Sequence, residues 1–183
     1  SQRIAATITE NLSRAQELTE RIERLSESAN DRKTSGGTRS SCVSLQARAS
    51  TTCKSVSETD SNPVATQIPL GSLSSDIDTV EKAIRVDRSA HSDFVNTVDS
   101  AKGAASKLHA RLEEDSHNGM AGSPEIKTAQ VQLDILKASL AGLEQKKDCR
   151  HLDWRKLDQQ ADELNANIRS LAARIEKMEQ EAK

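Results

Sequence analysis

The sequence predicts an all-α protein, an elongated antiparallel helical hairpin or coiled-coil bundle of about three long helices. Apolar residues recur every three and four positions over long stretches, which is the spacing of one narrow helix face. The 183 residues include one Phe, one Trp and no Tyr, and 30% of them are charged. Aromatic side chains supply much of the bulk of globular cores, so this composition is typical of long amphipathic helices with solvated outer faces.

The first predicted element is an amphipathic helix over residues 1–33. Its apolar positions are Ile4, Ile8, Ala15, Leu18, Ile22, Leu25 and Ala29. Asn11 fills the one gap in this series and also begins the glycosylation sequon Asn11-Leu12-Ser13. A glycan at Asn11 would block packing of the apolar face, so we interpret Asn11 as a polar residue that selects register or partner.

Residues 34–71 are predicted to be a flexible connector. Gly36-Gly37 and many Ser and Thr residues follow the first helix, and hydroxyl side chains compete for backbone hydrogen bonds. A short helix over residues 42–56 is an open alternative, because several apolar residues would share one of its faces: Cys42, Leu45, Ala49 and Val56.

Basic residues without acidic neighbours mark the same connector. Residues 32–57 contain no Asp or Glu and carry Arg32, Lys33, Arg39, Arg48 and Lys54. These side chains suit an acidic polymer surface, such as a nucleic-acid backbone or the acidic tails of a cytoskeletal polymer, and the alternative is a solvated linker. No aromatic residue is interleaved for base stacking, and a net charge of −2 gives no overall attraction to nucleic acid.

Residues 72–183 are predicted to form an antiparallel coiled-coil hairpin of two helices, residues 72–116 and 123–183. A Ser near residue 72 can cap the first helix. Asn118 and Gly119 favour the left-handed backbone conformation that ends a helix. The second helix would then start at Ser123-Pro124 and continue without a break to the last residue.

Charged and polar residues interrupt the apolar face of both predicted hairpin helices. Asp87 and His91 interrupt the first, and Lys147 and Arg150 interrupt the second. A turn centred near residue 120 puts these two pairs at matching heights, because both helices rise equally per residue. We therefore predict a polar layer that fixes register, in which Asp87 pairs with Arg150 and His91 lies near Lys147.

The second hairpin helix is longer than the first, so part of its apolar face lacks a cover. This uncovered set is Leu164, Ile168, Leu171, Ile175 and Met178. Either the first helix of the chain folds back onto these residues, or a second copy or partner helix covers them. The sequence therefore predicts a partner or self-association face here.

Enzymatic motifs are not found in this sequence. The phosphate-binding glycine loops, the dinucleotide fingerprint and the common zinc patterns do not occur, and Cys149 and His151 fall on outward positions that do not converge on a metal. We therefore predict no enzyme, no catalytic residue, no cofactor or metal, and no small-molecule substrate. No apolar run approaches the about 18 residues that span a bilayer, so no membrane insertion is expected.

These observations predict a structural coiled-coil module that dimerises or docks through protein helices, its own or a partner's. It would be a scaffold in a larger intracellular assembly of the cytoplasm or nucleus, such as a cytoskeletal, kinetochore-like or tethering complex. The alternative is an extracellular helical-bundle surface protein of a pathogen, acting as coat, adhesin or receptor. A Cys42–Cys53 disulfide or a glycan on Asn11 would favour that alternative, whereas three reduced thiols fit an intracellular protein better.

Overall fold

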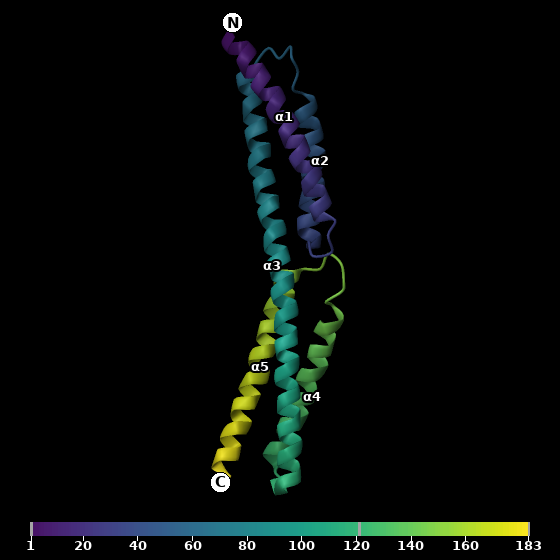
Figure 1. Cartoon of the computed structure of the whole chain (residues 1–183), viewed down its shortest axis with the longest axis vertical. Coiled ribbons are helices and arrows are strands. Elements are labelled where there is room, and N and C mark those ends of the chain that lie inside the picture. Colours follow the sequence, from purple (N-terminus) through teal and green to yellow (C-terminus); the bar gives the residue numbers. More distant parts are fainter. Residues whose placement is uncertain (1, 121, 183) are drawn as a thin grey trace. The chain divides into compact units, whose positions relative to one another are not determined.

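The structure, a computed structural model, describes residues 2–120 and 122–182, and all regular elements in these ranges are helical. The helices are α1 (Gln2–Ala29), α2 (Gly36–Lys54), α3 (Pro63–Asp115), α4 (Pro124–Gln145) and α5 (Trp154–Glu181), with a short turn η1 (Ser116–Met120) after α3 (Figure 1). The all-α prediction is confirmed. The prediction of about three long helices is wrong, because the described residues form five α-helices.

The chain folds into two compact units. The first contains residues 1–88 and 150–153, and the second contains residues 89–149 and 154–183. The 53-residue helix α3 therefore supplies its first part to one unit and its last part to the other. Each unit is built from three helical segments, and the first unit also includes a short loop that the chain supplies much later.

In the first unit, α1 and α2 pack against each other and against the beginning of α3 (Figure 1). One face of each helix is apolar at the spacing expected for burial. The resulting core consists of Ala15, Leu18, Ile22, Leu25, Ala29, Cys42, Leu45, Ala49, Leu70, Leu73, Ile77, Val80 and Ile84.

The segment predicted as a flexible connector contains helix α2. Ser35 caps this helix, and its side-chain oxygen accepts a hydrogen bond from the Thr38 backbone N–H at 3.2 Å. Residues of the predicted apolar face, including Cys42 and Leu45, are buried against the core. Burial of this face outweighs the weak helix propensity of the Ser and Thr residues. The sequence analysis gave that weak propensity too much weight when it predicted a flexible connector.

Helix α3 begins at Pro63, nine residues before the predicted start at residue 72. The Asn62 side chain accepts a hydrogen bond from the Ala65 N–H at 3.3 Å, and Pro63 occupies the first helical position, which needs no N–H donor. Pro69 lies inside the helix. Because Pro has no backbone N–H, one helical hydrogen bond is missing at this position. The burial of the next residue, Leu70, offsets this loss.

The long final helix predicted over residues 123–183 is interrupted at residues 146–153, between α4 and α5. This segment is Lys-Lys-Asp-Cys-Arg-His-Leu-Asp, which gives the helix no continuous apolar face to bury. The apolar residues of α4 and α5 fall in one heptad register because the length of the loop between them happens to keep the spacing. This continuity does not require one continuous helix. Lys147 and Arg150, which were predicted to contribute to a polar layer within one helix, instead lie in the loop after the end of α4.

In the second unit, α4 and α5 pack against each other and lie along the last part of α3 (Figure 1). The turn before α4 contains Gly119 at φ 91°, the left-handed conformation expected from the sequence. The last apolar residues were expected to lie beyond the reach of the predicted helix 72–116, under the first helix of the chain or a partner helix, and the structure gives them a different cover. Because the chain reverses at residues 146–153, α5 lies beside α3 and α4, and it buries Leu164, Ile168, Leu171 and Ile175 while Met178 is half-buried.

Candidate functional site

Asp87, predicted to pair with Arg150, holds the start of α2 in the first unit. Its side chain is 1% exposed, and its Oδ2 accepts a hydrogen bond from the Ser35 backbone N–H at 3.0 Å. The Arg150 side chain is exposed. Because Ser35 is the N-cap of α2, the buried carboxylate fixes the position at which that helix begins.

His151 attaches the 150–153 loop to the rest of the first unit. Its backbone N–H donates to the Arg32 carbonyl at 2.9 Å, and its carbonyl accepts from the Gly36 N–H at 2.9 Å. Its ring Nδ1 lies 3.0 Å from the Thr34 carbonyl oxygen. A Cβ on Gly36 would approach the His151 carbonyl to 3.3 Å, so glycine suits this close backbone contact. We call these contacts the His151 clasp.

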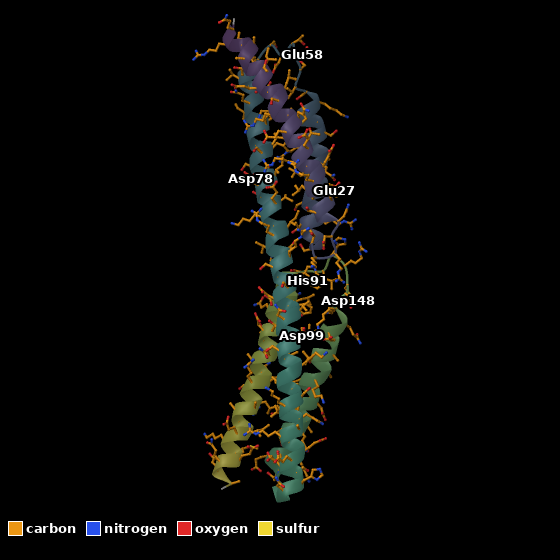
Figure 2. All side chains as sticks on the ribbon, in the orientation of Figure 1. Glu27, Glu58, Asp78, His91, Asp99 and Asp148 are labelled. Atoms are coloured by element: carbon orange, nitrogen blue, oxygen red, sulfur yellow. The ribbon has the colours of Figure 1, made fainter. Side chains whose placement is uncertain are left out.

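His91 belongs to the aromatic end of the second unit. Its ring is 6% exposed and packs edge-on against Trp154, with the ring centroids 4.4 Å apart. Its Nε2 lies 3.3 Å from the backbone carbonyl oxygen of Lys147. The Lys147 ammonium is ion-paired with Asp99, which lies two turns beyond His91 on α3 (Figure 2). His91 and Lys147 are thus neighbours through a backbone atom rather than through two side chains.

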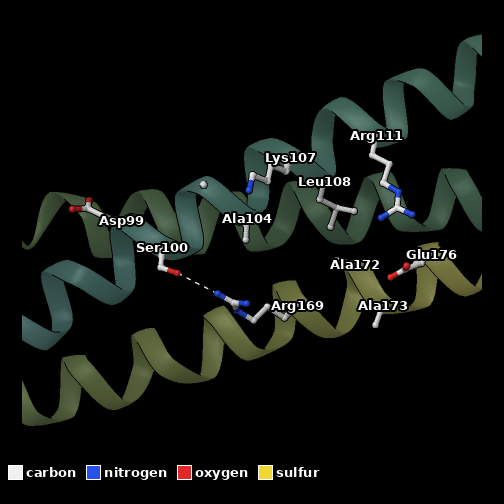
Figure 3. Close-up of a pocket in the computed structure, with 11 residues that line it drawn as sticks. Asp99, Ser100, Ala104, Lys107, Leu108, Arg111, Arg169, Ala172, Ala173 and Glu176 are labelled. Atoms are coloured by element: carbon white, nitrogen blue, oxygen red, sulfur yellow. Dashed lines mark hydrogen bonds between the residues drawn. The ribbon is translucent and has the colours of Figure 1, made fainter.

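A groove of about 550 Å³ lies between α3 and α5 in the second unit (Figure 3). Its small residues leave the space open, and the lining includes Gly103, Ala104, Ala172 and Ala173. Cations and carboxylates both surround it, and Figure 3 shows Arg169 hydrogen-bonded to Ser100 across the groove at 3.3 Å. An open groove of mixed charge suits contact with another protein surface better than enclosure of a substrate.

At one end of this groove, Arg111, Asp115 and Glu179 form a charged cluster. Arg111 Nε donates to the two Glu179 carboxylate oxygens at 2.9 and 3.0 Å. Burial, together with the hydrogen bond to Glu179, raises the pKa of Asp115 to about 6. Two neighbouring carboxyl groups resist ionising together, so this pair keeps a shared proton to a higher pH than an isolated carboxyl group would.

The predicted basic contact residues lie on the first unit. Arg32 and Lys33 are in the loop before α2, whereas Arg39, Arg48 and Lys54 are on α2. Arg48 forms an ion pair with Asp76 of α3. The other two cations of α2 are exposed, and α2 contains no acidic residue.

Two features that would have favoured a secreted protein do not fit the fold. Cys42 and Cys53 are eleven positions apart on α2, a separation of about 16 Å along a helix, which a disulfide cannot bridge. The Asn11 side chain is 2% exposed, and its Nδ2 donates to the Pro63 carbonyl at 2.8 Å. A glycan on Asn11 would displace α1 from the start of α3.

A surface that the sequence analysis missed lies on α4. Besides its buried face, α4 carries an uncharged outer row at three- and four-residue spacing, which we call the outer α4 stripe: Thr128, Val131, Ile135, Ala138 and Gly142. All five are exposed, and Val131 and Ile135 remain 59% and 62% exposed. The signal was present in the sequence as a second heptad row, but the stronger buried row concealed it.

Among the described residues, no three His, Cys, Asp or Glu side chains come together as metal ligands. Within the described ranges, every helix is too short or too polar to cross a bilayer. No known protein family, curated protein or solved structure matches this chain.

Proposed function

We propose that this chain is a non-enzymatic helical module that dimerises or docks within a larger intracellular assembly. The observation that supports this most is the outer α4 stripe. Val131 and Ile135 are large apolar side chains more than half exposed, one turn apart on one helix face. Scattered exposed apolar residues are ordinary, but an uncharged row at heptad spacing is suited to covering by another helix.

The arrangement of the rest of the second unit is consistent with this function. The apolar face of α5 is already buried inside the chain, so it does not need a partner helix. The outer α4 stripe is then the face at which another helix can add apolar contact. Docking there would leave the unit's own core intact.

The proposal is tested in cells of the source organism by native size fractionation of extracts that contain the tagged chain. Wild type is expected to migrate in an assembly larger than the chain alone. Ile135→Lys places a charge in the stripe and is expected to release the chain from this assembly. The matched control is Ile68→Lys, because Ile68 is 74% exposed on α3 and lies outside the stripe.

Circular dichroism of both purified variants establishes that they are folded. The proposal fails if wild type migrates at its own size, or if Ile135→Lys stays in the assembly as wild type does. If Ile68→Lys also releases the chain from the assembly, the effect is not specific to the outer α4 stripe. The stripe would then not be supported as the contact surface.

A further inference from the structure

We propose that the groove between α1 and α2 in the first unit binds a helix of another protein. This helix has one apolar face, cationic residues along one flank and acidic residues along the other. The groove does not involve the outer α4 stripe, so the inference goes beyond the proposed function. It follows from the apolar floor of the groove and from the opposite charges of its two sides.

The groove lies along the line where α1 and α2 pack side by side (Figure 1). Its volume is about 460 Å³, and its lining includes Ile22 and Glu23 of α1 and Ser50, Cys53 and Lys54 of α2. Ile22 is buried and Cys53 is half-buried, so the floor is apolar. An apolar floor between two helices suits the apolar face of a third helix.

The α1 side of the groove is acidic. Glu23 lines the groove, and Glu20 and Glu27 lie three residues before it and four residues after it, so the three carboxylates share one side of α1. All three are exposed. Arg24 is about 100° around the helix from Glu23, on the side opposite to Ile22 and the groove floor. Like charges in one row repel each other, so a cationic flank of a partner would stabilise this side.

The α2 side of the groove is basic. Ser50 and Lys54 line the groove, and Val43 and Arg39 lie seven and eleven residues before Ser50, on the same face of α2. Val43 is 60% exposed, and Arg39 and Lys54 are also exposed. The remaining cation of α2, Arg48, is ion-paired with α3. Two cations therefore flank an exposed apolar side chain, and no residue of α2 is acidic.

These charges specify the partner helix. Arg39 and Lys54 are fifteen positions apart, about 22 Å along α2, which a helix of about four turns spans. The acidic flank of the partner would lie against these two cations, and its cationic flank would lie against Glu23 and Glu27. Within the described residues these four side chains form no ion pair, so docking breaks none. Opposite charges on the two sides also disfavour a helix whose flanks are both acidic or both basic.

The probe for this groove is a stapled helical peptide of about fifteen residues, with leucines on one face, lysines along one flank and glutamates along the other. Binding is measured by the alkylation rates of two cysteines in the wild-type chain. Cys53 lines the groove, so saturating peptide is expected to slow its alkylation about fivefold or more. Cys149 is exposed in the second unit and is the control within the same molecule, because its rate should not change.

Charge reversal on α1 tests the match. Glu23→Lys combined with Glu27→Lys makes both sides of the groove basic. This double variant should bind the mixed peptide about tenfold more weakly than wild type, and it should bind a peptide with glutamates on both flanks more tightly than wild type does. The matched control combines Glu10→Lys with Glu17→Lys, because both residues are exposed and lie more than 100° around α1 from Glu23. Circular dichroism establishes that both double variants are folded.

Each outcome decides the inference. Protection of Cys53 but not Cys149, weakened in the groove variant and kept in the control variant, supports the docking site. An unprotected Cys53, or equal binding of both peptides by wild type, overturns it. Sedimentation equilibrium of the chain alone tests another occupant, since self-association abolished by the groove variant would assign the groove to a second copy and overturn the inference. Ile135→Lys should leave peptide binding unchanged, so a failure at this groove is distinguishable from a failure at the outer α4 stripe.

Discussion

The His151 clasp is tested by changing the backbone preference of one residue. His151 has φ 54°, the left-handed region, where a residue with a Cβ is disfavoured by about 1–2 kcal/mol. Its bonds to the loop before α2 hold it there. The ring Nδ1–H donates a hydrogen bond to the Thr34 carbonyl, which stabilises the clasp by about 0.5–1.5 kcal/mol.

Two substitutions separate these contributions. His151→Ala loses the ring contact and keeps the Cβ, so the first unit should lose about 1 kcal/mol of unfolding free energy. His151→Gly loses the same contact but removes the backbone penalty of about 1–2 kcal/mol. The greater freedom of Gly in the unfolded chain offsets about 0.4–1 kcal/mol of this gain. The Gly variant should therefore be about 0.5–1 kcal/mol more stable than the Ala variant.

The assay is urea unfolding followed by far-ultraviolet circular dichroism and by tryptophan fluorescence. Trp154, the single Trp of the chain, is buried in the second unit and reports on that unit, so the comparison of probes assigns the loss. The matched control is His109→Ala, because His109 is an exposed residue of α3, and a change within about 0.5 kcal/mol is expected. An Ala variant as stable as the Gly variant, or more so, would show that residue 151 does not adopt the left-handed conformation.

Three further predictions concern the two cores. Asn11→Ala removes the hydrogen bond to the Pro63 carbonyl, and the first unit should lose about 1–2 kcal/mol in urea unfolding; an unchanged midpoint would contradict this bond. The pKa of Asp115 is raised to about 6, so the stability from its proton shared with Glu179 is present below about pH 4 and is lost as the pH rises through about 6. Partial solvent exposure limits this loss of unfolding free energy to about 1 kcal/mol. Asp115→Asn should remove this contribution to the dependence of stability on pH between 4 and 7. If wild type gained stability relative to Asp115→Asn over this range, the assigned direction would be wrong. Trp154→Ala removes a fully buried side chain and should cost the second unit about 3–5 kcal/mol by circular dichroism, whereas a loss below about 1 kcal/mol would place Trp154 outside the core.

Much of the helical content could be predicted from residue spacing alone. Ile22 and Leu25 recur at helical spacing and are buried in the first core, and the same holds for Ile168 and Leu171 in the second. Asn118 and Gly119 marked the end of α3, because few other residues favour a left-handed backbone there. These features are local, so the sequence by itself determined them.

The partners of these faces were decided only by the tertiary structure. The same heptad row runs through α4 and α5, so the charged segment at residues 146–153 fits a polar interruption of one long helix as well as a loop at which the chain reverses. That reversal buries the apolar residues of α5 inside the chain and leaves the outer α4 stripe exposed. It also brings His151 to Gly36, residues far apart in sequence. Periodicity indicates which face of a helix is apolar. The arrangement in which the helices pack depends on contacts between distant residues, and this arrangement decides which faces remain exposed.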